Sequence, residues 1–302
     1  MRVQKIISLA KVLESLKHFA DMVVVKHSLF SLPFFLTSLF MSSYLHSNHL
    51  WFGFPLLLLG LLALMAARNF AMAANRLLDA KIDAKNPRTA NRHIPAQLLG
   101  FKTSIVFTIV NAAVFILCAY LINHLAFILS PIVLLILGSY SLFKRFSQSA
   151  HMILGFCLGL STLCADIMVS GSIHVHSSLL CFAVSFWCAG FDILYALQDM
   201  EFDKEQGLFS IPALYGKEAS IFISALCQAV ALIFLFLYFF EVEAGIWAFL
   251  AVIICALILC AEQVLIRLNY ASLNVVFFNL NSSLGIVFMI GFIIDLWIRH
   301  AL

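Results

Sequence analysis

The sequence predicts an all-α fold, a bundle of transmembrane helices that forms one integral membrane domain over residues 1–302. Of the 302 residues, 63% are hydrophobic and 11% are charged, and the mean hydropathy is +1.04. A soluble domain covers its surface with charge, at about a quarter of its residues, so this composition excludes one. Apolar runs of spanning length recur along the chain, and basic residues fall in alternate connections between them.

Nine apolar runs are long enough to cross a bilayer, because a spanning helix needs roughly twenty apolar residues. They lie near residues 27–45, 51–74, 103–122, 125–143, 150–171, 178–197, 219–240, 245–266 and 275–297. Pro131 falls inside the fourth run, where neighbouring helices can cover the carbonyl that it frees. We therefore expect nine transmembrane helices.

The distribution of Lys and Arg predicts the orientation of these helices. Basic residues precede the first run and follow the second, fourth, sixth and eighth, whereas the other connections (46–49, 123–124, 174–178 and 241–245) contain none. Cytoplasmic loops carry the excess of basic residues, so the N-terminus is expected in the cytoplasm and the C-terminus outside. The expected location is a bacterial-type inner membrane, with the functional site on its cytoplasmic side.

Residues 1–20 are predicted to form an amphipathic helix that lies on the cytoplasmic surface. Their apolar residues follow helical spacing and alternate with lysines. The alternative is that this segment is the beginning of the first transmembrane helix. The net charge of +3 follows from the basic cytoplasmic loops. It gives no indication of a nucleic-acid partner, and no obligate protein partner is evident.

Acidic residues are concentrated in two short segments, NRLLDAKID at 75–83 and DILYALQDMEFDKE at 192–205, which hold seven of the fifteen. Each segment ends a predicted span on the same side of the membrane. Polar residues fall four apart in both, which predicts one helical face in each segment. These residues are Asn75, Asp79 and Asp83 in the first segment, and Tyr195, Asp199 and Asp203 exactly 120 positions later in the second.

Aspartates in this arrangement predict a site for a diphosphate and magnesium. Mg²⁺ binds one or two carboxylates together with phosphate oxygens, so four aspartates could hold one or two ions with a diphosphate between them. Basic side chains on the same side would neutralise the remaining phosphate charge. The candidates are Arg88, Arg92, Lys144, Arg145 and Lys204. The alternative is a solvated loop of mixed charge.

Four segments resemble the UbiA-type prenyltransferases. NRLLDAKID is similar to their NxxxDxxxD signature, and FDILYALQDMEFD is similar to their second signature, DxxYxxxDxxxD. RTANR at 88–92 and YSLFKR at 140–145 are similar to segments of the 4-hydroxybenzoate branch of that family. The resemblance covers nearly the whole chain and implies the fold of that family.

The resemblance implies that a polyprenyl group is transferred from its diphosphate to a ring carbon of an aromatic acceptor. Asp79 and Asp83 would hold one magnesium, with Asn75 as a ligand or support, and Asp199 and Asp203 would hold the second. Arg145 corresponds to a position that grips the diphosphate. The partners would be a polyprenyl diphosphate, a small aromatic acceptor and the lipid bilayer.

Asp192 and Tyr195 are the further catalytic candidates, because the resemblance implies that the ring or the allylic carbon lies beside them. The face of Tyr195 can stabilise an allylic cation by cation–π attraction. The ring proton is lost after attack on this cation, and either Asp192 or the released diphosphate can accept it.

Arg68 lies inside the second predicted span, where a charge is costly unless it meets a wet cavity or a partner. It precedes Asn75 by seven residues on roughly the same helical face, so it is a candidate for binding the carboxylate of the acceptor, or the diphosphate. The alternative pairs it with an acid such as Asp192. Lys26 has a weaker claim to the same role, since snorkelling to the membrane surface also explains it.

The resemblance favours 4-hydroxybenzoate as the acceptor, with a carboxylated naphthalene as the alternative. LYALQDMEFDKEQGLFSIP at 194–212 resembles the 4-hydroxybenzoate enzymes of ubiquinone biosynthesis and a sister group. That group prenylates a carboxylated naphthalene in the futalosine route to menaquinone. The segment 159–171 lacks the Pro- and Trp-containing pattern expected of the first group. A polytopic transporter is a remote alternative. The polar residues of a transporter should cluster near the midplane of the membrane, whereas the acidic segments of this chain lie at the cytoplasmic ends of predicted helices.

Overall fold

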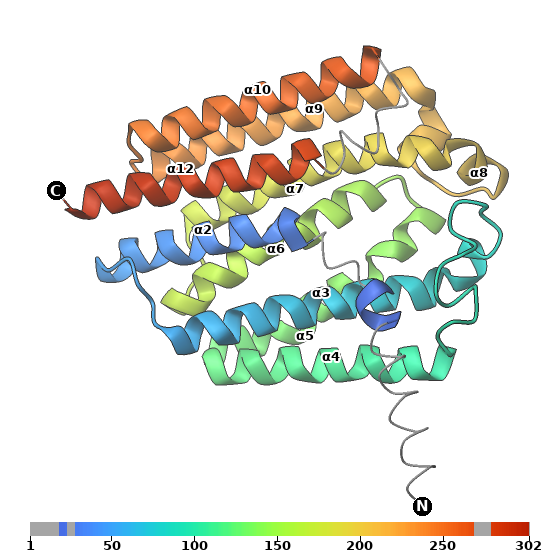
Figure 1. The fold of residues 1–302 in the computed structure, drawn as a ribbon, viewed down its shortest axis with the longest axis horizontal. Helices are drawn as coiled ribbons and strands as arrows, with labels where there is room; N and C mark the ends of the chain where they lie inside the picture. The colour runs from blue at the N-terminus through green and yellow to red at the C-terminus, as the bar shows by residue number, and fades with distance from the viewer. Residues whose placement is uncertain (1–17, 23–27, 269–278, 302) are drawn as a thin grey trace, which may run out of the picture.

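The computed structural model describes residues 18–22, 28–268 and 279–301. All regular elements within these ranges are helices, which confirms the predicted all-α fold (Figure 1). The long helices are α2 (Ser28–Ser47), α3 (Phe54–Asp83), α4 (Phe101–Ile122), α5 (His124–Ser139), α6 (Ala150–Ser170), α7 (Val175–Ala196), α9 (Ile211–Glu241), α10 (Ile246–Leu268) and α12 (Asn281–Ala301).

Eight helical segments within the described residues are long and apolar enough to cross a membrane, and they begin with α3. The first predicted span, 27–45, corresponds to α2, which packs against α6 and α12. The count of nine spans and the cytoplasmic N-terminus stay predictions. The expected surface helix over 1–20 lies mainly outside the described residues, and Lys26 lies outside them entirely.

Successive long helices run in opposite directions along the bundle (Figure 1). One end carries the loop 84–100, the segment 140–149 and the segment 197–210, and we call it the motif end because both acidic segments reach it. The other end carries the turns 48–53 and 171–174, and we call it the far end. The two acidic segments therefore lie on one side of the bundle, as predicted.

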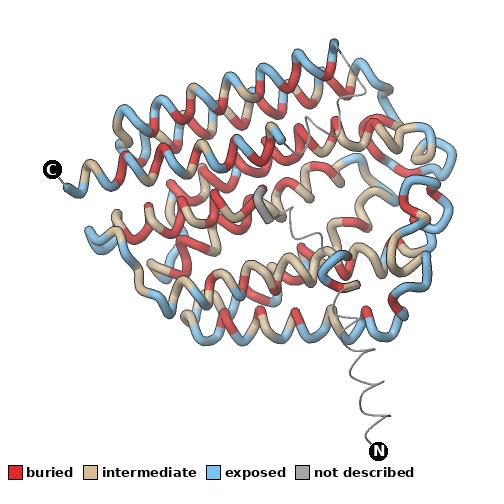
Figure 2. The backbone as a smooth tube through the Cα atoms, viewed as in Figure 1, coloured by how far each residue is buried: buried red, intermediate tan, exposed pale blue. Residues whose placement is uncertain are grey.

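Exposed residues follow the outer faces of the bundle (Figure 2), and many of them are large and hydrophobic. On α4 the side chain of Ile109 is 62% exposed, and on α10 that of Leu257 is 63% exposed, although both residues lie mid-helix. A contiguous apolar surface of this extent requires lipid around it. The chain is therefore an integral membrane protein.

Small residues allow α6 and α7 to pack closely. A Cβ atom at Gly155 would lie 2.1 Å from the carbonyl oxygen of Ser185, and one at Gly159 would lie 2.4 Å from that of Cys181. Glycine at such positions is the usual way for membrane helices to approach each other. The close contact fixes α6 against α7 along their length, and so positions the polar pairs that lie at both ends of the two helices.

The two acidic segments differ in backbone structure. Asn75, Asp79 and Asp83 all lie in α3, which continues to Asp83 without a break, as the sequence predicted. The second segment does not form one regular helix, so the expectation of a single α-helical face there is wrong. After α7 the chain forms a 3₁₀ turn over Leu197–Asp199 and then the short helix α8 (Met200–Glu205). A 3₁₀ turn is wound more tightly than an α-helix, so it rotates Asp199 relative to Tyr195.

Candidate active site

Asp79 is buried near the motif end of α3 and is surrounded by positive charge. The Nζ atom of Lys144 lies 2.7 Å from its Oδ2 atom, and Nη2 of Arg145 lies 3.3 Å from its Oδ1 atom. The side-chain amide of Asn75, one turn earlier, donates to Oδ2 at 2.9 Å. The carboxylate is only 1% exposed, so its charge requires these partners. Arg145 also donates to the carbonyl of Leu78, which fixes its guanidinium beside α3.

Asp83, one turn further along α3, pairs with Arg92. The Nη1 atom of Arg92 donates to both carboxylate oxygens, at 2.7 Å and 2.8 Å. The hydroxyl of Thr89 donates to the backbone carbonyl of Asp83 at 3.1 Å, so the loop 84–100 folds back over the end of α3. The loop therefore delivers its basic residues to the aspartates of the helix before it.

Asp199 belongs to the second acidic segment, yet its partners come from the loop after the first. Arg88 forms a two-pronged ion pair with it: Nε donates to Oδ1 at 2.8 Å, and Nη2 pairs with Oδ2. The buried side-chain amide of Asn86 also donates to Oδ1, at 2.9 Å. Burial opposes the charge of Arg88, but the hydrogen bonds and charge of Asp199 outweigh it and raise the pKa of Arg88.

Tyr195 lies one turn before Asp199 and contacts the same arginine. The guanidinium carbon of Arg88 lies 5.5 Å from the centre of the Tyr195 ring, within the range of a cation–π contact. Nη1 of Arg88 also donates to the Tyr195 hydroxyl at 3.4 Å. The face of this ring is therefore oriented toward positive charge at the motif end.

Asp203, on α8, completes the set of aspartates. It is partly buried and close enough to Asp199 and Lys144 for their charges to interact. The backbone N–H of Phe209 donates to the carbonyl of Lys144 at 2.7 Å, which ties the segment after α8 to the basic pair beside Asp79. The two acidic segments therefore converge. Lys204 differs from the other basic candidates, because it is exposed on α8 and forms no ion pair with any of the four aspartates.

A cavity of about 540 Å³ opens among α2 to α7 beside these aspartates. Its polar lining includes Arg68 and Asp192, which the sequence analysis selected inside predicted spans, but none of the four motif aspartates. Its other lining is apolar and extends along α2, α3 and α6 toward the far end. The polar residues are Arg68, Arg76, Arg92, Tyr140, Asp192 and Tyr195, and the apolar ones include Phe35, Gly60, Phe115 and Met168. The cavity is therefore amphipathic along its length.

Asp192 lines this cavity and pairs with a histidine that the sequence analysis did not select. Nδ1 of His151, at the start of α6, lies 2.6 Å from Oδ2 of Asp192. The backbone N–H of Ile211 donates to Nε2 of His151 at 3.3 Å, so Nε2 carries no proton and Nδ1 donates to the carboxylate. His151 was missed because it is isolated in sequence, and only the packing of α6 against α7 brings it to Asp192. Asn86 was missed for a similar reason, since a single polar residue in a loop carries no recognisable pattern.

These side chains can bind a polyanion together with a hard cation. Carboxylate oxygens are preferred ligands of Mg²⁺, and guanidinium and ammonium groups are the usual partners of phosphate oxygens. Where a carboxylate pairs with Lys or Arg, a metal cation could bind the carboxylate while a phosphate group binds the basic side chain, and the two added charges would offset each other. The apolar cavity beside them suits a hydrocarbon chain.

A charged site at one end of a lipid-embedded helix bundle, next to an apolar cavity, defines a membrane enzyme for substrates with a charged head and an apolar tail. A match between the sequence and a family model identifies the family of this chain. The chain belongs to the UbiA prenyltransferase family, whose model matches residues 31–284. It is therefore a membrane-embedded transferase of the prenyltransferase class.

Curated relatives of this chain share low sequence identity with it over most of their length. A 4-hydroxybenzoate octaprenyltransferase from Enterobacter sp. (strain 638) is 27% identical over 225 residues, which is 74% of this chain and 77% of the relative. One from Francisella tularensis subsp. tularensis (strain WY96-3418) is 24% identical over 241 residues, 80% of this chain and 83% of the relative.

Solved structures confirm the fold. The apo structure of a UbiA homolog from Aeropyrum pernix K1 is 30% identical, has a TM-score of 0.81, and covers 89% of this chain and 98% of its own. A UbiA homolog from Archaeoglobus fulgidus, bound to GPP and Mg²⁺, is 18% identical with a TM-score of 0.67, covering 91% of this chain and 99% of its own. At that identity the second structure supports the fold alone.

Proposed function

We propose that this protein transfers a polyprenyl group from its diphosphate to a ring carbon of 4-hydroxybenzoate, in the biosynthesis of a ubiquinone-type quinone. The observation that carries the proposal is the convergence of both acidic segments and their basic partners beside an amphipathic cavity. The 4-hydroxybenzoate octaprenyltransferases among the relatives support this acceptor. The basic loops at the motif end support a cytoplasmic active site in a bacterial-type inner membrane.

The donor set at the motif end fits magnesium. Asp79, Asp83, Asp199 and Asp203 supply carboxylate oxygens, and Asn75 supplies an amide that now donates to Asp79. These oxygens are hard ligands, which suit Mg²⁺ better than a transition metal. In our proposal Asp79 and Asp83 hold one ion, with Asn75 as a ligand or support, and Asp199 and Asp203 hold the second.

The basic residues of the site would exchange partners when substrate binds. Arg88, Arg92, Lys144 and Arg145 now pair with the aspartates. Once those carboxylates bind a cation, the same basic groups are available for the diphosphate oxygens, without a large change in the net charge of the site. Lys204, exposed on α8, would act at the edge of the site through its charge.

The residues around the cavity have distinct roles in the proposed reaction. Magnesium, when bound, supplies stabilisation of the negative charge that develops on the leaving diphosphate. Tyr195 stabilises the allylic cation through the face of its ring. Arg68, in the wall of the cavity, binds the carboxylate of the acceptor. Asp192 orients the acceptor or accepts its ring proton, with His151 holding the carboxylate in place.

The apolar part of the cavity would hold the polyprenyl tail, and Gly60 lies in its wall. A Cβ atom at Gly60 would lie 2.5 Å from Cε of Met168 and 2.9 Å from Cζ of Phe35, the far ends of two side chains. We expect Gly60→Leu to displace about two methylenes of the tail. Each buried methylene contributes about 0.8 kcal/mol, so kcat/KM for a long donor should fall roughly tenfold relative to geranyl diphosphate. Leu58→Phe, on the outer face of α3, is the control. An unchanged donor preference in Gly60→Leu would place the tail elsewhere.

The test of the proposed function is a reaction with purified protein in detergent. Geranyl diphosphate is supplied with either 4-hydroxybenzoate or a carboxylated naphthalene, and the products are identified by mass. We expect geranylated 4-hydroxybenzoate, loss of this product with EDTA, and its recovery when Mg²⁺ is added. Product from the naphthalene alone would replace the acceptor in the proposal by the alternative. No product from either acceptor, with Mg²⁺ present, would contradict the proposal.

A further inference from the structure

A second polar cluster lies at the far end of the bundle, away from the candidate active site. Its centre is Asp166 on α6, whose side chain is 0% exposed. Oδ1 of Asp166 lies 3.5 Å from Nε2 of His46 and 3.4 Å from Nε2 of His176. Its Oδ2 atom lies 3.0 Å from Nδ1 of His174. The histidines come from the end of α2 and from the start of α7, so three helices meet at one carboxylate.

The carboxylate of Asp166 is held in a fixed orientation. The hydroxyl of Ser177 donates to Oδ2 at 2.7 Å, and the backbone N–H of His174 donates to the same atom at 3.2 Å. The hydroxyl of Ser42 donates to Oδ1 at 2.8 Å. Hydrogen bonds of this kind orient the ligands of a metal and are a regular part of metal sites. They fix Asp166 so that Oδ1 faces the Nε2 atoms of His46 and His176.

We propose that Oδ1 of Asp166 and Nε2 of His46 and His176 bind a zinc ion. Zinc prefers tetrahedral sites of His nitrogens and carboxylate oxygens at about 2.0–2.2 Å, so neighbouring ligand atoms should lie about 3.3–3.5 Å apart. The two distances from Oδ1 agree with this, and all three ligand atoms lie within 4.8 Å of one another. His46 is partly exposed, which gives the ion access from solution and leaves the fourth position for water or His174.

The ion would join α2, α6 and α7 at the end of the bundle that is remote from the reaction. These helices also supply walls of the cavity, including Phe35 on α2 and Met168 on α6, two residues from Asp166. The zinc would therefore act as a structural clamp for the apolar part of the cavity. This inference is independent of the proposed function, because none of its ligands lines the cavity or belongs to an acidic motif.

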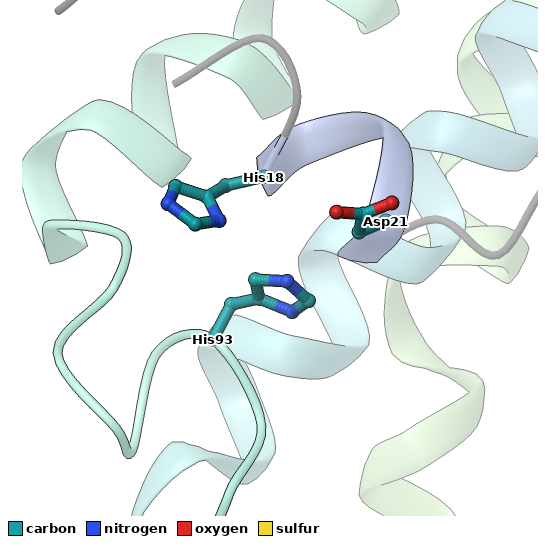
Figure 3. Close-up of side chains that lie close together, drawn as sticks. All are labelled: His18, Asp21 and His93. Atoms are coloured by element: carbon teal, nitrogen blue, oxygen red, sulfur yellow. The ribbon is translucent and has the colours of Figure 1, made fainter. Parts of the chain in front are cut away.

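Another group of potential ligands lies at the motif end and serves as an internal comparison. Figure 3 shows His18 and Asp21 on a short helical turn, with His93 on the loop that follows α3. Asp21 is exposed, and among the described residues none holds its carboxylate with hydrogen bonds like those around Asp166. Burial and the neighbouring His18 lower the pKa of His93. A metal ligand binds more tightly when hydrogen bonds hold it in place, so we expect this group to bind a metal less tightly than the group around Asp166.

The experiment measures zinc bound by the full chain, purified in detergent with an affinity tag free of histidine. The protein is stripped with chelator, equilibrated with Zn²⁺ in excess Mg²⁺ to occupy the aspartate site, and analysed by elemental mass spectrometry and thermal unfolding. The variants are His46→Ala and His176→Ala. The matched controls are His49→Ala, beside the same turn, and His93→Ala in the comparison group.

We expect one zinc per chain in the wild type and in both controls, with a rise in Tm on zinc addition. Loss of an outer-shell partner alone weakens metal binding by about 10–100-fold, so His46→Ala and His176→Ala, which remove ligands, should weaken zinc binding at least about 100-fold and abolish the zinc-dependent rise in Tm. His46 is partly exposed, so its variant should fold even if the buried His176 variant does not. The proposal is wrong if the wild type retains no zinc, if His46→Ala binds zinc as tightly as the wild type, or if only His93→Ala loses it.

Discussion

Asp79→Asn should abolish prenyl transfer while the protein still reaches the membrane in normal amount. The substitution keeps the size of the side chain but removes a proposed oxygen ligand of magnesium and the charge that Lys144 and Arg145 neutralise. Lys144 and Arg145, whose side chains are 27% and 39% exposed, then lose this partner, and they would hold the diphosphate in the wrong place. Removal of one group that stabilises a developing charge costs about 10²–10³ in turnover. Because loss of Asp79 affects both the metal and its basic neighbours, we expect a fall of at least about 10³ in kcat.

Asp199→Asn should have an effect of similar size from the other acidic segment, because it releases Arg88 and Asn86 together. Glu201→Gln is the matched control, since it makes the same chemical change on exposed α8, between Asp199 and Asp203. Turnover is measured over a range of Mg²⁺ concentrations, with membrane content followed by immunoblot. Magnesium-dependent turnover within tenfold of the wild type in both Asp variants would contradict the assignment of the site.

The sequence could predict the fold and could indicate the aspartates of the candidate site, because both depend on local patterns. Runs of apolar residues indicated the helices, and acidic residues four apart marked the ends of α3 and α7. Asn75, Asp79 and Asp83 lie in one helix, so their relation followed from helical spacing alone. The break at Leu197–Asp199 could not be predicted in the same way. It depends on long-range partners, since Asp199 is held by Arg88 and Asn86 from another connection.

The pairs that join distant parts of the chain were beyond the sequence. The sequence indicated the basic residues only as a group, and nothing in their spacing indicated that Arg92 pairs with Asp83 and Lys144 with Asp79. The histidines that surround Asp166 were overlooked because His46 is 120 positions away from it in sequence and because His174 and His176 lie in a short connection between two predicted spans. Isolated histidines in polar turns are common, and only the packing of three helices gives this group a chemical meaning.

His151→Ala should lower kcat about 10²-fold while the KM for the prenyl diphosphate changes little. Nδ1 of His151 donates to Asp192 at 2.6 Å, and this bond fixes the carboxylate where it lines the cavity. Without the bond Asp192 is still present, but it can rotate away from the acceptor, and small errors in position cost about this factor. The effect should fall on kcat, because the diphosphate is bound by other residues. We therefore expect His151 to be a positioning residue and Asp192 a catalytic one.

His151→Asn should recover most of the lost activity, because its amide nitrogen can occupy the position of Nδ1 and donate to the same oxygen. Both substitutions can also lower stability, because His151 accepts a hydrogen bond from the backbone N–H of Ile211. Leaving this buried donor unsatisfied costs about 1–3 kcal/mol of stability. Thermal unfolding of each variant measures that cost, and activity is assayed well below the lowest Tm.

The decisive comparison is between the single variants and the double variant. If His151 acts through Asp192, then adding His151→Ala to Asp192→Asn should lower kcat little further, because the bond that His151 supplies no longer has a carboxylate to hold. Independent roles would instead multiply the two losses. Multiplied losses, or a His151→Asn variant as slow as His151→Ala, would show that His151 does not work by positioning Asp192. Either result would leave orientation of the acceptor to Asp192 alone.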